Sequence, residues 1–229
     1  MKKYLWCEDS GSGYQFWCAI FRVLYPDILV EPKGGNVGLR KAARGVRSDG
    51  NTYFILMDTV VDNPDALRET RQLIHEVNGK DNIVIVKIHS FEFALLSFEL
   101  LEQWVFARVD ELKDKRQNLF RAREILIRFL TSEGTGSELL ELKELLKEPE
   151  YKNTEQIAAK LLFEITRNTG FETTKGQLGH CFVNNCCEWD MRQSDDICGL
   201  DDDRISAEEK AQILVNKSIL RETFERAGL

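Results

Sequence analysis

Short apolar runs alternate with helical patterns of apolar residues over the first 105 positions of the chain. Strands are expected at the runs 4–7, 28–30, 52–58 and 82–88. Helices are expected between and after them, over 14–25, 37–46, 64–77 and 91–104. The third run, "TYFILMD", is nearly all apolar, as expected of a strand that is covered on both faces. Repeated strand–helix units predict an α/β fold with a parallel sheet and right-handed crossovers.

The pattern changes after Trp104. The following segments are a long amphipathic helix over 108–130, helices near 137–147 and 153–168, an irregular cysteine-rich segment over 170–203, and a last helix that Ser206 caps. Ser206 and Glu209 have the spacing of a capping box. The sequence therefore predicts an α/β domain over 1–105 and a helical extension over 106–229 that includes the cysteine-rich segment.

Composition and charge restrict the classes of function. The chain has 229 residues, of which 43% are hydrophobic, so it can bury a core. Its net charge of −7 argues against binding to nucleic acid or membranes through overall charge, but allows a local basic patch. No apolar run approaches membrane-spanning length, and the start "MKKYLWCEDS" is too short for a secretory signal, so we expect a cytoplasmic protein.

Acidic residues follow three of the four expected strands. They are Glu8 and Asp9 after the first strand, Asp58 and Asp62 after the third, and Glu92 after the fourth. Because the carboxyl ends of parallel strands meet at one edge of a sheet, we expect these carboxylates to gather there. Hard oxygen ligands of this kind suit Mg²⁺ or Mn²⁺. The alternative is that the acids cap helices, as Asp62 could do for the helix that Pro64 enters.

The turn after the first strand contains Gly11 and Gly13. Glycine-rich turns at helix N-termini bind phosphate through backbone N–H groups, and a cation held by the neighbouring acids could present a phosphate to this turn. The turn lacks the Gly-Lys-Ser/Thr of a P-loop and the third spaced glycine of a dinucleotide site.

The segment from 33 to 47 is basic and contains no acid. Its cations are Lys33, Arg40, Lys41, Arg44 and Arg47. In an acidic chain, this local reversal of charge predicts contact with the phosphate backbone of a nucleic acid. The alternative is a solvated helix face that pairs with acids elsewhere in the protein.

The order of these elements and acids resembles the toprim fold, a Rossmann-like α/β fold of topoisomerases, primases and nucleases of bacterial phage-defence systems. Members place a Glu after the first strand and Asp-x-Asp after the third, which Glu8 and Asp58 match. Here "MDTVVDN" puts the second acid, Asp62, four residues on. "HSFEFALLSF" resembles the Glu-bearing segment of phage-defence relatives, which makes Glu92 a further metal ligand.

The resemblance covers roughly residues 3 to 104. It implies cleavage of phosphodiester bonds in nucleic acid that depends on Mg²⁺ or Mn²⁺, with Glu8, Asp58 and Asp62 as catalytic residues. It also implies that a separate ATPase or another protein can be a partner, since no ATPase motif lies in this chain.

Two alternatives stay open. A phosphoacceptor receiver domain also places two acids after its first strand and an Asp after its third, which would make Asp58 the phosphorylated residue. Receivers need a fifth strand that ends in Lys, whereas the pattern here predicts a long helix in that region. The other alternative is a non-catalytic interaction protein.

The cysteine-rich segment could hold a structural Zn²⁺. Its candidate ligands are His180, Cys181, Cys186, Cys187 and Cys198. Zinc sites usually contain a Cys-x2-Cys pair, which this spacing lacks, so we favour free thiols over a zinc site.

Overall fold

The computed structural model describes residues 1–60, 62–105, 110–131, 136–146, 153–167 and 206–229. The strands β1 (Lys3–Cys7), β2 (Ile28–Pro32), β3 (Thr52–Asp58) and β4 (Ile83–Ile88) form one sheet in the order β2-β1-β3-β4. Every pairing is parallel. The expected α/β class and parallel sheet are therefore confirmed.

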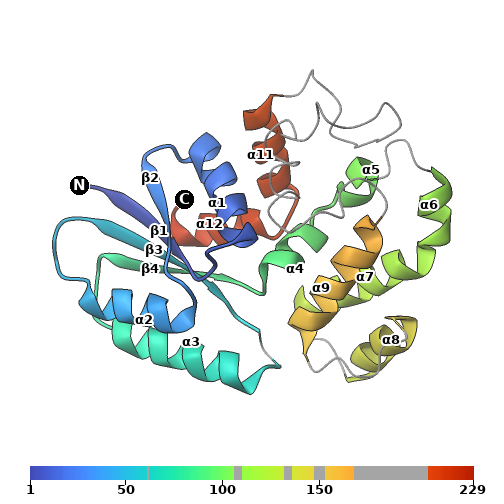
Figure 1. Cartoon of the computed structure of the whole chain (residues 1–229), viewed down its shortest axis with the longest axis horizontal. Helices are drawn as coiled ribbons and strands as arrows, with labels where there is room; N and C mark the ends of the chain where they lie inside the picture. Colours follow the sequence, from blue (N-terminus) through green and yellow to red (C-terminus); the bar gives the residue numbers. More distant parts are fainter. Residues whose placement is uncertain (61, 106–109, 132–135, 147–152, 168–205) are drawn as a thin grey trace.

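Helices cover both faces of the sheet (Figure 1). α2 (Asn36–Gly45) and α3 (Pro64–Val77) pack together on one face, and α1 (Ser12–Leu24) lies on the other. The side chains of β3 point alternately to the two faces of the sheet. Ile55 belongs to the core under α2 and α3, whereas Leu56 belongs to the larger core on the opposite face. Burial on both sides explains why this strand is almost entirely apolar.

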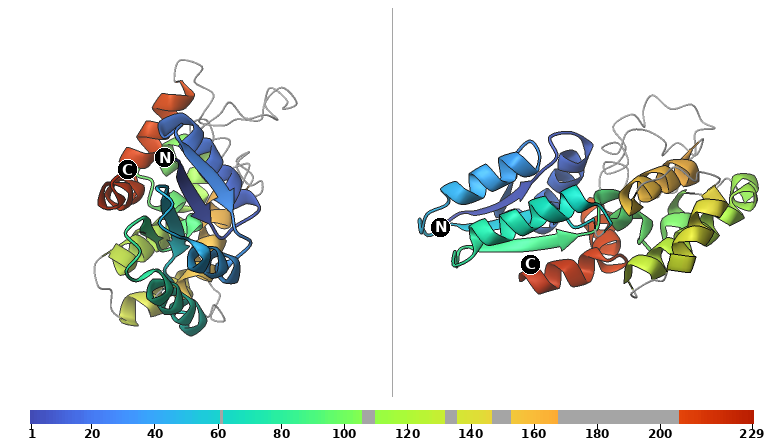
Figure 2. Two further views of the ribbon diagram at one scale, coloured as in Figure 1. Left: turned by 90° about the vertical axis from the view of Figure 1, so that its left-hand side faces the viewer. Right: turned by 90° about the horizontal axis from the view of Figure 1, so that it is seen from below.

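A group of helices lies beyond the carboxyl ends of the strands (Figures 1 and 2). They are α4 (Phe91–Leu96), α5 (Leu101–Val105), α6 (Asp110–Lys115), α7 (Gln117–Thr131), α8 (Gly136–Leu146) and α9 (Thr154–Thr166). The expected helix over 91–104 is divided into α4 and α5, and the long helix expected over 108–130 is interrupted between α6 and α7. At the second break the buried Arg116 donates hydrogen bonds to the carbonyls of Ile165 and Arg167 at the end of α9.

The last two helices return to the sheet. α11 (Ala207–Asn216) packs on α1, and α12 (Leu220–Ala227) packs on β4. The ring of Phe224 in α12 lies 5.6 Å from that of Phe21 and 5.9 Å from that of Tyr25, measured between centroids. The main core therefore includes residues from β1 to α12, and it extends across the boundary expected at 105/106.

Two further expectations concern single elements. Ser206 caps α11 as expected, since its Oγ accepts a hydrogen bond of 3.1 Å from the N–H of Glu209. Among the described helices, none combines the length and apolar character that crossing a membrane requires.

Candidate functional site

Carboxylates from several elements meet around Asp58, the last residue of β3. Burial raises the pKa of the Asp58 carboxyl well above its ordinary value, and the negative charges nearby raise it further. Those charges belong to Glu8, Glu92, Asp9 and Glu155, in order of decreasing effect. Acids after the first, third and fourth strands thus lie close enough to influence one another, together with an acid from α9. We call this set the acidic cluster; its members are Glu8, Asp9, Asp58, Glu92 and Glu155.

The loop between β2 and α2 holds Glu8 in place. The N–H of Gly35 donates a 2.6 Å hydrogen bond to the backbone carbonyl of Glu8, and the Asn36 side chain donates to its carboxylate. Gly34 and Gly35 have φ angles of 70° and 95°, which the loop needs and which glycine adopts without strain. Burial, followed by the charge of Asp9, raises the pKa of the Glu8 carboxyl. Its Oε2 is buried without a hydrogen-bond partner among the described residues.

The glycine turn accommodates the carboxylate of Asp9. A Cβ on Gly13 would lie 2.0 Å from Asp9 Oδ2, so only glycine allows this carboxylate to rest against the first turn of α1. The N-cap residue, Gly11, has no side chain with which to cap this helix, and the partial positive charge of the helix N-terminus favours an anion here. The protein's own carboxylate thus lies where the sequence suggested a bound phosphate.

Glu92 and Glu155 both belong to the first turns of helices. Glu92 is only 3% exposed, and Ser90 caps its helix by accepting a 3.1 Å hydrogen bond from the N–H of Phe93. Helix N-termini stabilise such carboxylates, which offsets part of the repulsion in the acidic cluster.

Asp62 anchors α9. Its Oδ2 accepts a hydrogen bond from the N–H of Thr154 and its Oδ1 accepts one from Thr154 Oγ1, each 2.8 Å long. Asp62 is not the cap of α3, because the Asn63 side chain accepts the hydrogen bonds from the N–H groups at the start of that helix. The contact with Thr154 brings the next residue, Glu155, to the acidic cluster. Glu155 was not among the residues predicted from the sequence, because it follows no strand; only the Asn-Thr-Glu start of its helix marks the place.

The donors of the acidic cluster are carboxylate oxygens, which suit a hard cation such as Mg²⁺ or Mn²⁺. The unpartnered Oε2 of Glu8 is available as a ligand. However, among the described residues, no three Asp, Glu, His or Cys side chains stand close enough to hold one ion. Binding of a cation therefore requires these side chains to move closer together.

Two of the five candidate nucleic-acid residues pair with acids of α3. Arg40 lies 2.7 Å from Glu69 and 3.5 Å from Glu76, and Arg44 lies 2.6 Å from Glu76. For Arg40 and Arg44, the structure therefore supports the alternative interpretation of the basic segment, in which its cations pair with acids elsewhere in the protein.

The other three candidates lie along a different side of α2. Lys33 forms a 2.6 Å ion pair with Glu31, and its ammonium lies 4.4 Å from the centre of the Trp6 ring. Lys41 and Arg47 are exposed, and their side chains make no hydrogen bond or ion pair with the described residues.

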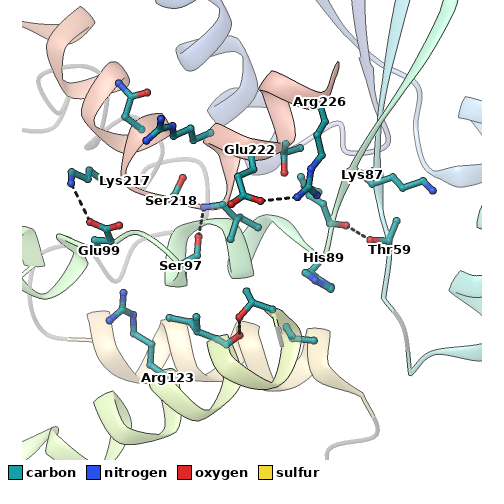
Figure 3. A pocket seen from close by; sticks show the side chains of 18 residues that line it. Thr59, Lys87, His89, Ser97, Glu99, Arg123, Lys217, Ser218, Glu222 and Arg226 are labelled. Atoms are coloured by element: carbon teal, nitrogen blue, oxygen red, sulfur yellow. Dashed lines mark hydrogen bonds and ion pairs between the residues drawn. The ribbon is translucent and has the colours of Figure 1, made fainter. Parts of the chain in front are cut away.

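A separate cavity of about 920 Å³ lies between the end of β4, α7 and α12 (Figure 3). Its charged groups mostly satisfy one another, as Arg226 does with Glu222 at 2.7 Å. Arg123 donates to backbone carbonyls of α4 and the turn after it. Burial lowers the pKa of His89, whose Nδ1 has no partner among the described residues.

The candidate zinc ligands of the cysteine-rich segment fall outside the described residues. Cys7 and Cys18, which the structure does describe, are free thiols. Burial raises the pKa of the Cys7 thiol to about 12, so it is not a reactive nucleophile at neutral pH.

Comparison of the chain with family models, with curated proteins and with solved structures gives no match.

Proposed function

We propose that the chain is a toprim-like hydrolase that cleaves phosphodiester bonds in nucleic acid and depends on Mg²⁺ or Mn²⁺. The observation that carries the proposal is the half-buried Asp58 carboxylate, to which four other carboxylates lie close enough to raise its pKa. Like charges in a site partly shielded from water oppose ionisation and are tolerated when a proton or a cation compensates them. A cation would compensate the negative charges that the parallel sheet gathers at this edge.

Each residue of the site has a separate role in this proposal. Glu8, Asp58 and Glu92 hold the cation, and Asp9 and Glu155 lie close enough to add charge. When bound, the cation neutralises the cluster and stabilises the negative charge that develops at phosphorus. Asn36 fixes the Glu8 carboxylate, whereas Asp62 is a positioning residue because it holds α9 and Glu155 in place.

The receiver alternative has less support. A receiver requires a fifth strand that ends in Lys beside the fourth, but the sheet formed by the described residues ends at β4, which is followed by α4. The hydrolase proposal includes nucleic acid as substrate, a cytoplasmic location, and a separate ATPase or other protein as partner.

The test combines cleavage with metal binding. We expect labelled single- or double-stranded DNA or RNA to be cleaved in Mn²⁺, and Mn²⁺ to raise the melting temperature of the protein. Asp58→Asn should abolish both effects. Asp65→Asn is the control, because this carboxylate of α3 is 80% exposed and lies outside the acidic cluster.

Three results separate the candidate functions. Phosphorylation of Asp58 by acetyl phosphate without cleavage would establish the receiver instead. Stabilisation by Mn²⁺ without cleavage would confirm the metal site and contradict independent hydrolysis. Absence of both cleavage and stabilisation by Mn²⁺ would favour the third candidate, a non-catalytic interaction protein.

A further inference from the structure

The cavity between the end of β4, α7 and α12 has no role in the proposed hydrolase (Figure 3). Its volume of about 920 Å³ lies within the range of pockets that hold small organic ligands. The lining includes the apolar side chains of Ile127, Leu130 and Ile219, which are all partly exposed. The cavity is therefore large enough, and in part apolar enough, for a ligand bigger than an inorganic ion.

Arg123 of α7 brings a positive charge to this cavity. Its Nε and Nη2 donate hydrogen bonds of 2.6 and 2.8 Å to the carbonyls of Leu96 and Phe98, which fixes the guanidinium against the turn after α4 (Figure 3). Burial lowers the pKa of Arg123, and the charges of Glu102 and Glu124 oppose this decrease. Among the described residues, however, no carboxylate forms an ion pair with Arg123. The guanidinium is thus partly desolvated without a paired anion.

One edge of this guanidinium stays open. Nη1 of Arg123 makes no hydrogen bond within the described part of the chain and, unlike Nδ1 of His89 in the same lining, it is not enclosed by the protein. Because the two backbone contacts already hold the side chain, a ligand that binds at Nη1 does not have to order it. Guanidinium N–H groups form strong charge-assisted hydrogen bonds to phosphate and carboxylate oxygens.

The rest of the lining also favours an anion. It contains more cations than carboxylates, in a chain whose net charge is −7. The cations are Lys87, Arg123, Lys217, Arg221 and Arg226, and the carboxylates are Glu99 and Glu222. Lys217, Arg221 and Arg226 each pair with a glutamate, but the side chains in all three pairs are more than half exposed. Exposed ion pairs of this kind are weak, so the anionic group of a ligand can replace a glutamate.

We propose that this cavity binds a small organic phosphate, with its phosphate group at Arg123 Nη1 and its apolar part against Ile127, Leu130 and Ile219. A phosphate monoester has a charge of about −1.5 to −2 at pH 7, which suits a lining with several excess cations better than a single carboxylate does. The proposal does not depend on the hydrolase function, because the cavity and the acidic cluster share no residue.

The experiment is isothermal titration calorimetry of the full chain with AMP, adenosine and inorganic phosphate, in EDTA. EDTA removes the divalent cations that can bring a phosphate to the acidic cluster. AMP is the probe because it joins a phosphate monoester to a planar base. We expect AMP to bind more tightly than inorganic phosphate. Adenosine should bind at least about tenfold more weakly than AMP, because it lacks the anionic partner of Arg123.

Two variants change the charge of the lining in opposite directions. Lys217→Glu adds negative charge and should weaken AMP binding by about fivefold or more. Glu222→Gln removes a negative charge and releases Arg226 from its ion pair, so it should strengthen AMP binding. Both replaced side chains are more than half exposed, so the melting temperature should change little.

The matched control is Arg128→Glu. Arg128 is an exposed cation of α7 that forms a 2.9 Å ion pair with Glu138, but it does not line the cavity. The control changes the net charge of the protein by the same amount as Lys217→Glu. We expect it to keep the AMP affinity of the unmodified protein more closely than Lys217→Glu does.

Arg123→Lys tests the anchor itself. Lysine keeps the positive charge, but its single ammonium lacks the planar fork that holds two carbonyls and a phosphate at once. We expect AMP affinity to fall by about tenfold at a temperature at which the variant is folded, and the melting temperature to decrease because the contacts with α4 weaken.

Equal binding of AMP and adenosine would overturn the inference, as would absence of AMP binding or an AMP affinity that Lys217→Glu and Glu222→Gln leave unchanged. Inorganic phosphate that binds as tightly as AMP would contradict an organic ligand. AMP binding as expected, without cleavage of nucleic acid in Mn²⁺, would contradict the hydrolase proposal alone. Cleavage without AMP binding would contradict this inference alone.

Discussion

Replacement of Asp62 by alanine tests whether this residue anchors α9. In the structure each carboxylate oxygen of Asp62 accepts a 2.8 Å hydrogen bond from Thr154, one from the backbone N–H and one from the hydroxyl group. Thr154 is the first residue of α9 and only 3% exposed. Its N–H has no acceptor within the helix, because the first N–H groups of any α-helix lack one.

The expected loss of stability follows from these two contacts. A hydrogen bond to a charged group contributes about 1.5–3 kcal/mol, and the two bonds here share one acceptor group, so their contributions do not add fully. We therefore expect Asp62→Ala to lower the free energy of unfolding by about 2–4 kcal/mol.

The assay is urea unfolding in EDTA, which keeps metal binding out of the measurement. A double-mutant cycle with Thr154→Ala should give a coupling energy of at least about 1 kcal/mol, since the two residues contact each other directly. Asp65→Ala is the control: its exposed ion pair with Arg68 is worth only about 0.2–0.5 kcal/mol.

One outcome would refute this reasoning. If Asp62→Ala changes stability in EDTA by less than about 0.5 kcal/mol, a size typical of surface substitutions, Asp62 does not anchor α9. If the same variant loses the stabilisation by Mn²⁺, Asp62 is a metal ligand.

Two further predictions concern the acidic cluster. The raised pKa of Asp58 means that its contribution to stability is fully present below the unfolded pKa of about 3.8 and is lost as pH rises through the folded pKa. Asp58→Asn should therefore be more stable than the unmodified protein at pH 7 in EDTA, with the difference shrinking toward pH 4; calorimetry over this range checks it, and a less stable variant at pH 7 would contradict it. Gly13→Ala places a methyl group 2.0 Å from Asp9 Oδ2 and should cost about 1–3 kcal/mol in urea unfolding. The cost should be smaller in an Asp9→Ala background, and an equal cost in both backgrounds would show that Asp9 does not cause it.

The strands and most of the acidic cluster could be predicted because both depend on local sequence and on the topology of a parallel sheet. The run "TYFILMD" forms β3 and ends at Asp58 as expected. Given parallel strands, the acids that follow them must lie at one edge. Glu155 depends instead on a tertiary contact between Asp62 and Thr154, which no periodicity in the sequence records.

The roles of the arginines were harder to predict, although a signal was present. Arg40 and Arg44 are four residues apart on α2, and Glu69 and Glu76 are seven apart on α3, so each pair occupies one face of its helix. These faces meet only because α2 and α3 pack side by side. Periodicity also could not reveal the break at Arg116, because the residue fits the helical pattern while its side chain binds the end of α9.

The position of α12 on the sheet has a consequence for synthesis of the protein. β4 ends at Ile88 and α12 begins at Leu220, about 130 residues later. At translation rates of about 5–20 residues per second, roughly 6–26 s pass between the appearance of these two elements. During this interval Phe21 and Tyr25 lack the aromatic partner that Phe224 later provides. The nascent chain therefore exposes an apolar surface that chaperones can recognise before the sheet is covered.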